Sequence, residues 1–246
     1  MSDARVALVT GASRGIGAAI AARLVRDGYR VWLGGRDSSV LAARAAQLAE
    51  AGPGAAQPLV LDVADASSIA AAFRVVHTDS RRLDVLVNNA GIMDDALTGM
   101  LQPAALERTL ATNVSGTVLC QQAAARLMQR QKRGSIVNVS SVMATHGTAG
   151  KVAYAASKAA VEGATRAAAR ELAPWGIRVN AVAPGWVETD LLATLTDAQR
   201  TQARERTPLG RAGTANEIAA VVAFLAGDEA AYVTGAIVPV DGGYVP

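Results

Sequence analysis

The sequence has little of the side chains that hold metals or crosslink small proteins. Its 246 residues include one cysteine, Cys120, and two histidines, His77 and His146. A single cysteine forms no disulfide within the chain, and these three side chains do not complete the usual zinc ligand sets. We therefore expect no internal disulfide and no bound metal, and we interpret Cys120 as a core thiol on an apolar helix.

Long apolar runs are also missing. Hydrophobic residues make up 51% of the chain, which supports a sizeable buried core. Glycine, proline or charged residues nevertheless interrupt every apolar stretch before the ~18 to 20 residues that a membrane span requires. The first residues, MSDARVALVTG, carry no signal-peptide pattern. We expect no membrane span and a cytoplasmic location.

Neither sign of charge is in large excess. The chain has 24 Lys and Arg beside 21 Asp and Glu, a net charge of +3, and the basic residues are spread along its length. Because such diffuse charge is a weak footprint for nucleic acid, we expect no nucleic-acid partner. The one compact basic cluster is Arg130, Lys132 and Arg133, which is either a solvated helix end or a contact for an anionic partner.

Apolar runs of strand length alternate with alanine-rich helical segments. The runs are continuous, as is typical of parallel strands covered by helices on both faces, and the intervening segments are long enough for right-handed crossovers. We predict one domain over residues 1–246, a Rossmann-type doubly wound α/β sheet of seven mainly parallel strands that binds ligands outside its carboxyl edge. The expected strands are Arg5–Thr10, Arg30–Leu33, Gln57–Leu61, Leu83–Asn88, Gly134–Val139, Ile177–Ala183 and Ala236–Val240, and the expected helices include Gly15–Asp27, Ser39–Ala51, Ser67–Thr78, Pro103–Arg130 and Ala153–Ala173.

A glycine-rich turn follows the first expected strand, directly before a helix. Glycines there let the backbone approach a pyrophosphate, whose charge is favoured by the free N–H groups at the helix start. Any tight strand-to-helix connection can carry three glycines, but the position after the first strand favours a dinucleotide site. The residues expected to contact the cofactor are Gly11, Ser13, Arg14, Gly15, Ile16 and Gly17.

The end of the second strand bears on the choice between NAD and NADP. An NAD enzyme usually carries an acidic residue there for the ribose 2′-hydroxyl, and this chain has Gly35. Arg36 and Arg14 could instead pair with a 2′-phosphate, which favours NADP(H). Asp37 leaves NAD open, because a loop register shifted by two residues would bring its carboxylate to the ribose. After the third strand, Asp62 could accept a hydrogen bond from the adenine amino group while Val63 covers the ring.

Three motifs, taken together and in this order, carry a resemblance. They are Thr10-Gly11-x-x-x-Gly15-x-Gly17, Asn88-Asn89-Ala90-Gly91 and Tyr154-x-x-x-Lys158. The whole chain resembles the short-chain dehydrogenase/reductase family, and the segments Pro184–Asp190 and Ala230–Gly243 look most like its 3-oxoacyl-[acyl-carrier-protein] reductases. The second motif is also a plausible turn, since asparagine and glycine tolerate unusual backbone angles, and Asn89, Ala90 and Gly91 can line the cofactor cleft in the same way.

Tyr154 is the candidate proton donor. Hydride delivery to a carbonyl leaves an alkoxide that must be protonated, and a free tyrosine with a pKa near ~10 is a poor acid–base group at neutral pH. Lys158 lies four residues later, on the same face of a helix, where its ammonium would favour the phenolate and lower that pKa. An ordinary exposed helix pair would have the same spacing.

The resemblance implies the other site residues. Ser141 matches the serine that hydrogen-bonds the substrate carbonyl, with Ser140 as its competitor in register, and Asn113 matches a fourth catalytic residue whose carbonyl-bound water leads to the lysine. The loop after the sixth strand is implied to meet the nicotinamide and the pyrophosphate through Pro184, Gly185, Val187 and Thr189. The turn Val142–Gly150 is expected at the substrate side, where His146 is either solvated or a substrate contact.

We predict NADPH-dependent reduction of a 3-oxoacyl thioester, linked to acyl carrier protein or CoA, to the 3-hydroxyacyl product. One alternative is an NADP(H)-dependent dehydrogenase or reductase of a small ketone, sugar or steroid alcohol, and another is a non-catalytic dinucleotide sensor. For a carrier-protein substrate, the cluster of Arg130, Lys132 and Arg133 would dock the acidic partner beside the site. The resemblance implies a homotetramer, with the helices that carry Asn113 and Tyr154 at its interface.

Overall fold

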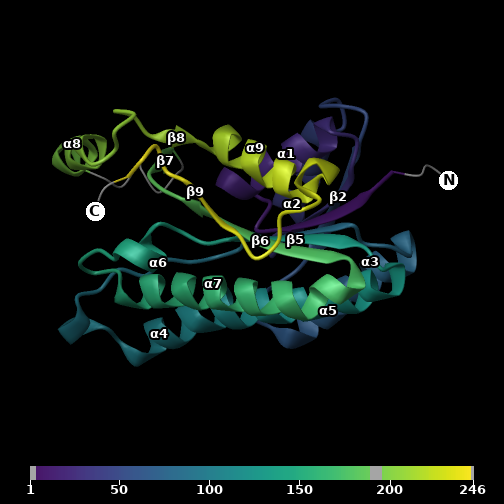
Figure 1. Cartoon of the computed structure of the whole chain (residues 1–246), viewed down its shortest axis with the longest axis horizontal. Coiled ribbons are helices and arrows are strands. Elements are labelled where there is room, and N and C mark those ends of the chain that lie inside the picture. Colours follow the sequence, from purple (N-terminus) through teal and green to yellow (C-terminus); the bar gives the residue numbers. More distant parts are fainter. Residues whose placement is uncertain (1–3, 189–195, 245–246) are drawn as a thin grey trace.

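The computed structural model describes residues 4–188 and 196–244, and a seven-stranded sheet runs through the middle of the molecule (Figure 1). Its spatial order is β3-β2-β1-β4-β5-β6-β9, and every neighbouring pair is parallel. All seven predicted strands are present. Their bounds are Val6–Thr10 (β1), Arg30–Gly35 (β2), Ala55–Val60 (β3), Val85–Asn88 (β4), Gly134–Val139 (β5), Ile177–Pro184 (β6) and Ile237–Val240 (β9).

Helices cover both faces of this sheet (Figure 1). On one face lie α1 (Gly15–Arg26), α2 (Ser38–Leu48) and α9 (Ala215–Ala226), and on the other lie α3 (Ala66–Ser80), α5 (Gly116–Gln131) and α7 (Val152–Leu172). The shorter helices are α4 (Pro103–Leu110), α6 (Met143–His146) and α8 (Asp197–Glu205). The strand order reverses between β1 and β4, where ligands of doubly wound sheets bind.

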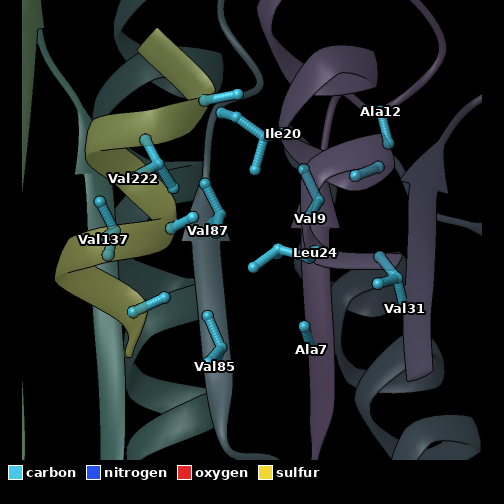
Figure 2. Close-up of a cluster of buried hydrophobic side chains, with 14 of the residues drawn as sticks. Ala7, Val9, Ala12, Ile20, Leu24, Val31, Val85, Val87, Val137 and Val222 are labelled. Atoms are coloured by element: carbon cyan, nitrogen blue, oxygen red, sulfur yellow. The ribbon is translucent and has the colours of Figure 1, made fainter. Parts of the chain in front are cut away.

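Two apolar layers hold the helices to the sheet. In the first, Val9 and Val87 point from neighbouring strands toward Ile20 and Leu24 of α1 and Val222 of α9 (Figure 2). Alternate residues of the same strands, such as Leu8 and Leu86, belong to the second layer with Cys120 of α5. Both sheet faces are therefore buried, which is why the strands are continuously apolar. Burial raises the pKa of the Cys120 thiol to about 12, as expected of a core residue.

The segment predicted as one helix over Pro103–Arg130 is interrupted. Residues Ala111–Ser115 form a π-helix, η2, between α4 and α5. Such a turn holds one extra residue and is found most often at functional sites. The structure also contains a parallel pair of two-residue strands that was not predicted, β7 (Val187–Glu188) and β8 (Gly213–Thr214). No helix within the described residues is both long and apolar enough to cross a membrane.

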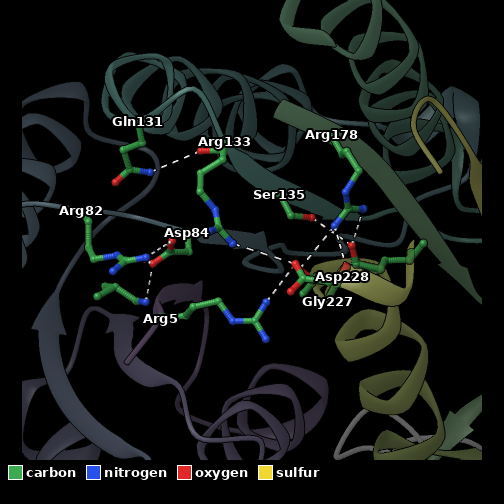
Figure 3. A network of polar contacts seen from close by, with 12 residues as sticks. Arg5, Arg82, Asp84, Gln131, Arg133, Ser135, Arg178, Gly227 and Asp228 are labelled. Carbon is green, nitrogen blue, oxygen red and sulfur yellow. Dashed lines mark hydrogen bonds and ion pairs between the residues drawn. The ribbon is translucent and has the colours of Figure 1, made fainter. Parts of the chain in front are cut away.

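At the amino edge of the sheet, charged side chains tie the ends of strands to α9 (Figure 3). Arg178 of β6 donates hydrogen bonds to the carbonyl oxygens of Leu225 (2.7 Å) and Gly227 (2.9 Å), with longer bonds to Ala226 and Val233. The carbonyls of Leu225, Ala226 and Gly227 lie at the carboxyl end of α9, so the guanidinium caps that helix and complements its dipole. Partial burial lowers the pKa of Arg178.

The basic cluster of Arg130, Lys132 and Arg133 lies at this amino edge. Lys132 ends α5, β5 begins at Gly134, and Ser141 follows the carboxyl end of the same strand. Six residues of strand span about 20 Å. The cluster and Ser141 therefore lie at opposite ends of β5, and the cluster is not beside the predicted site, where it was expected to dock an acidic partner. Arg133 instead lies 4.0 Å from Asp228, which also pairs with Arg5 at 3.2 Å.

Candidate active site

The glycine-rich turn after β1 is held by the turn after β4. The hydroxyl of Thr10 accepts hydrogen bonds from the backbone N–H groups of Asn89 and Ala90, both at 3.0 Å. The side-chain amide of Asn89 donates to the carbonyl oxygens of Thr10 and Gly11, at 3.0 and 3.1 Å. Asn89 is thus a structural partner of the glycine-rich turn as well as a candidate cofactor contact.

Gly11 and Gly17 of the turn leave no room for a side chain. A Cβ on Gly17 would lie 2.2 Å from the carbonyl oxygen of Gly11, and one on Gly11 would lie 2.9 Å from Cα of Ala90. Gly11 and Gly15 also have left-handed backbone angles, with φ of 66° and 56°. The first turn of α1 holds no acidic residue and has no side-chain cap. The bare backbone at this helix start fits a dinucleotide pyrophosphate.

The carboxylate of Asp37 is engaged as the N-cap of α2. It accepts hydrogen bonds from the backbone N–H groups of Ser39 (2.9 Å) and Val40 (3.1 Å) and from the Ser39 hydroxyl (2.6 Å). The hydroxyl of Ser39, together with these N–H groups, lowers the pKa of Asp37. Arg36 and Arg14 are exposed at the same edge. In this structure the carboxylate of Asp37 caps the start of α2.

After β3, one carboxylate oxygen of Asp62 accepts a hydrogen bond from the backbone N–H of Ala64 at 3.0 Å. Its own backbone N–H donates to the hydroxyl of Ser68 at 2.9 Å, which fixes the turn. Val63 is buried in the second apolar layer, and a Cβ on Gly116 would lie 2.6 Å from its carbonyl oxygen. Val63 therefore anchors the position of Asp62 against α5.

Asn113 lies in the π-helix and is buried at 1% exposure. Its side chain accepts from the N–H of Ile92 and donates to the carbonyl of the same residue, both at 2.8 Å, and it also donates to the Ser157 hydroxyl at 2.9 Å. Its own carbonyl oxygen accepts from the hydroxyl of Thr117 at 2.8 Å. The side chain therefore joins the turn after β4 to the helix that carries Tyr154.

Gly91 marks the place where these residues meet. A Cβ on Gly91 would lie 3.3 Å from Oδ1 of Asn113 and 3.5 Å from Nζ of Lys158. The turn after β4, the π-helix and α7, which are far apart in the sequence, thus meet at the carboxyl edge of the sheet. The absence of a side chain at Gly91 keeps space open beside the lysine.

The two candidate serines have different environments. The Ser140 hydroxyl is buried and donates to the carbonyl oxygen of Lys158 (3.3 Å) and to Oε1 of Glu162 (3.1 Å), so it ties β5 to α7. The Ser141 hydroxyl is hydrogen-bonded to Tyr154, and it accepts from the N–H of Met143 at 3.2 Å. Ser141 is therefore the serine that faces the tyrosine.

Lys158 and Tyr154 lie together on α7. The lysine Nζ is 5.6 Å from the centroid of the tyrosine ring and donates to the carbonyl oxygen of Val139 at 2.7 Å. Burial lowers the pKa of Lys158 from 10.5 to about 8. In the chain without cofactor, burial raises the pKa of Tyr154, while the hydrogen bond with Ser141 lowers it. Burial is the larger of these two effects, so the pKa of Tyr154 lies above its ordinary value, and the expected net lowering by Lys158 is not found.

The loop after β6 approaches from the other side. Pro184 ends β6 and accepts from the N–H of Val142 at 3.1 Å, so this loop touches the turn that carries Ser141. A Cβ on Gly185 would lie 2.7 Å from Cα of Asp241, and Val187 is buried in β7. The predicted pyrophosphate contact, Thr189, lies outside the described residues.

Three side chains near the site had no part in the sequence analysis. Ser157 links Asn113 to the carbonyl oxygen of Tyr154 at 2.7 Å, Glu162 holds Ser140, and Arg44 of α2 donates to the carbonyl oxygen of Ser13 at 3.4 Å. Ser157 and Glu162 lie one turn or less from the Tyr-x-x-x-Lys motif, so helical spacing could have indicated both. The contact of Arg44 depends on how α2 packs, which no local pattern reveals.

Comparisons with known proteins agree with this geometry. A family model described as enoyl-(acyl carrier protein) reductase matches residues 11–245. A 3-oxoacyl-[acyl-carrier-protein] reductase FabG from Pseudomonas aeruginosa is 45% identical over 97% of this chain and 96% of its own length. The reductase of the same name from Thermotoga maritima is 42% identical over 99% of this chain and 98% of its own length. Both relatives therefore span nearly the whole chain.

Solved structures extend the comparison. A 3-oxoacyl-[acyl-carrier protein] reductase from Brucella melitensis has a TM-score of 0.93 at 33% identity and covers 98% of this chain and 91% of its own. A gluconate 5-dehydrogenase from Burkholderia cenocepacia, solved in complex with NADP and tartrate, has a TM-score of 0.94 at 33% identity and covers 98% of this chain and 95% of its own. The Rossmann-like fold is thus shared by enzymes with different substrates.

Proposed function

This chain belongs to the short-chain dehydrogenase/reductase family, and from that premise we propose that it reduces a 3-oxoacyl thioester to the 3-hydroxyacyl product with NADPH. It is an oxidoreductase acting on CH–OH and C=O groups, and its cofactor is a nicotinamide dinucleotide. The observation that carries the proposal is the convergence of Ser141, Tyr154 and Lys158, in a chain 42–45% identical to 3-oxoacyl-[acyl-carrier-protein] reductases.

Ser141, Tyr154 and Lys158 have different roles in the proposed reaction. The Ser141 hydroxyl donates to the substrate carbonyl oxygen and stabilises the negative charge that develops there. Bound NADPH supplies the hydride. The Tyr154 hydroxyl gives its proton to the same oxygen, and the ammonium of Lys158 offsets the charge left on the phenolate. Asn113 keeps the turn after β4 in place through its two bonds to Ile92.

The pKa of Lys158 gives the reaction a pH dependence. With a pKa of about 8, the lysine is mostly charged at pH 7 and loses its proton as the pH rises through 8. A neutral lysine no longer offsets the phenolate charge. The reduction rate is therefore expected to fall above about pH 8, and a pH–rate profile at saturating NADPH measures this.

Support for NADP(H) comes from the end of β2. Gly35 offers no carboxylate to repel a 2′-phosphate, Asp37 is engaged by α2, and Arg36 and Arg14 are exposed beside the turn. A guanidinium group pairs with a phosphate through charge-assisted hydrogen bonds. Dissociation constants for NADPH and NADH measured on Tyr154→Phe test this preference without turnover, and equal affinities would contradict it.

The substrate proposal is tested with purified protein, NADPH and acetoacetyl thioesters of acyl carrier protein and CoA, beside gluconate with NADP⁺. Rapid reduction of the thioesters, lost in Tyr154→Phe, supports the proposal. Turnover of gluconate alone would favour the activity named for the Burkholderia cenocepacia structure. Cofactor binding without turnover of any of these would favour a dinucleotide sensor.

We also propose a homotetramer with α4, α5 and α7 at its interface. Leu110, Val118 and Val152 expose apolar side chains on these helices, at 37%, 40% and 46% exposure. Burial of such a surface stabilises association. Light scattering should give four times the mass of one chain, and Val118→Glu should lower that mass; a monomeric wild-type protein would contradict this assembly.

A further inference from the structure

The last described residues of the chain return to the catalytic edge of the sheet. Val240 ends β9 beside Pro184, and its carbonyl oxygen accepts from the N–H of Gly185 at 3.1 Å. Asp241 then lies against Gly185, where a Cβ on the glycine would come within 2.7 Å of it. Residues 241–244 are thus placed next to the loop after β6, on the same edge as Ser141.

Tyr244 contacts the turn that carries the catalytic serine. Its ring lies 6.0 Å from that of His146, measured between centroids, with an angle of 53° between the planes. His146 is the last residue of α6, and α6 begins at Met143, whose N–H donates to the Ser141 hydroxyl. The ring pair therefore joins residues 241–244 to His146, five residues after Ser141.

The backbone before Tyr244 is held in position. Gly242 and Gly243 have φ of 67° and 82°, a conformation that favours glycine. The carbonyl oxygen of Gly242 accepts from the N–H of Leu209 at 3.2 Å, and a Cβ on Gly243 would lie 3.3 Å from Cγ of Pro208. These contacts set the direction in which Tyr244 leaves the turn.

The side chains at this place form an apolar collar, defined here as Met143, His146, Pro208, Leu209 and Tyr244. None of the five is an aspartate, glutamate, lysine or arginine. Leu209 is 67% exposed, so its side chain is accessible to a ligand. The collar thus offers apolar and aromatic surface to a ligand held by Ser141.

We propose that Tyr244 and His146 are specificity-determining residues that contact the alkyl chain of the substrate. This inference rests on the proposed reduction of a 3-oxoacyl thioester. Two parts of such a substrate lead away from the reacting carbonyl, an apolar alkyl chain and a thioester arm rich in amides. An amide arm needs several hydrogen-bond partners. The collar's backbone N–H of Leu209 and carbonyl of Gly242 are already paired with each other, which leaves the Tyr244 hydroxyl and the His146 ring nitrogens as its polar groups. The alkyl chain gains most from this surface, because contact with the rings removes it from water.

The test compares chain lengths in matched variants. Wild type, Tyr244→Ala, His146→Ala and the double variant are assayed with NADPH and 3-oxobutanoyl or 3-oxodecanoyl N-acetylcysteamine thioesters. We expect kcat/KM for the ten-carbon substrate to fall about tenfold in Tyr244→Ala, through KM, since burial of a few methylene groups is lost. The value for the four-carbon substrate should stay within about twofold, because its chain is too short to reach the collar.

Two controls separate the ring contact from general damage. Tyr232→Ala removes a fully exposed tyrosine outside the site, at 104% exposure, and should change neither value. Tyr244→Phe keeps the ring and should keep the wild-type ratio of the two values. Thermal melting of each variant checks that the chain is folded.

Two results would overturn the inference. An unchanged ratio in Tyr244→Ala and His146→Ala would mean that the alkyl chain does not touch the collar, and an equal loss for both chain lengths would mean that the collar holds the thioester arm. Failure of the proposed function is a separate result, in which wild type reduces neither thioester. The same ratio is then measured with 2-butanone and 2-decanone, and the same two outcomes apply.

Discussion

Lys158→Met should remove activity, and near pH 7 the variant should be as stable as the wild type or more stable. The ammonium of Lys158 is buried, and burial lowers its pKa from 10.5 to about 8. A lowered pKa means that the folded chain holds the charged form less well than the unfolded chain does. Methionine has a similar length and no charge, so the variant escapes this penalty.

The size of the effect follows from the pKa. Below pH 8 the lysine is charged in both states, and a pKa difference of about 2.5 corresponds to a penalty of about 3 kcal/mol. Between pH 8 and 10.5 only the unfolded chain is charged, so the penalty shrinks as the pH rises and is absent above 10.5. The variant also leaves the carbonyl oxygen of Val139 without its 2.7 Å hydrogen bond, which costs about 1 to 3 kcal/mol at every pH. Near pH 7 these two contributions nearly cancel or favour the variant, and at pH 10 the wild type is the more stable protein.

The assay is urea unfolding of both proteins without cofactor, followed by tryptophan fluorescence at one protein concentration. The free energy of unfolding of the variant, relative to wild type, should decrease by about 2 to 3 kcal/mol from pH 7 to pH 10. Lys132→Met replaces an exposed lysine and should show no such change. A relative stability of Lys158→Met that stays constant between the two pH values would refute the reasoning.

Four further substitutions probe contacts described above. Ser141→Ala should lower kcat by about a hundredfold or more, because it removes a donor to the reacting oxygen. Ser140→Ala should mainly lower stability, because the Ser140 hydroxyl ties β5 to α7. Steady-state kinetics and thermal melting separate the two effects. Arg178→Met should lower the melting temperature by about 6 °C or more, from the loss of two short charge-assisted bonds worth about 3 kcal/mol. Asp37→Ala should weaken the start of α2 and leave the ratio of NADPH to NADH affinity unchanged.

Each of these has an outcome that contradicts it. Equal kcat in Ser141→Ala and Ser140→Ala would remove the distinction between the two serines. A melting temperature of Arg178→Met equal to that of Arg133→Met, whose ion pair is long and exposed, would show that capping of α9 contributes little. A large gain in NADH affinity in Asp37→Ala would mean that its carboxylate does act on the cofactor.

The sheet was predictable because burial on both faces makes each strand an uninterrupted apolar run. Val6–Thr10 and Gly134–Val139 were located within a residue of their ends. The pair β7 and β8 was missed, since strands of two residues leave no periodic pattern. The start of α9 carried a usable signal, because Thr214 and Glu217 form a capping box that the sequence already contains.

Candidate site residues can be named from the sequence where a motif fixes their spacing, and they are ambiguous where neighbouring residues compete for one position. Sequence alone could not separate Ser140 from Ser141, because the turn after β5 decides which hydroxyl faces Tyr154. The role of Asp37 depended on where α2 begins. The pKa of Tyr154 is raised because the side chain is buried, and the sequence motif gives no information about burial.

The π-helix at Ala111–Ser115 limits how the chain can change in length. An α-helix turns by about 100° per residue, so deletion of one residue in this segment would turn α5 against α4 by that amount. Asn113 and Cys120 lie on one continuous helical segment. The rotation would therefore move either Asn113 away from Ile92 and Ser157 or Cys120 out of the core. Deletion of one residue here is therefore expected to lower stability and activity more than most substitutions do. The turn Thr148–Gly150 is not helical, so a deletion there would not rotate one helix against another.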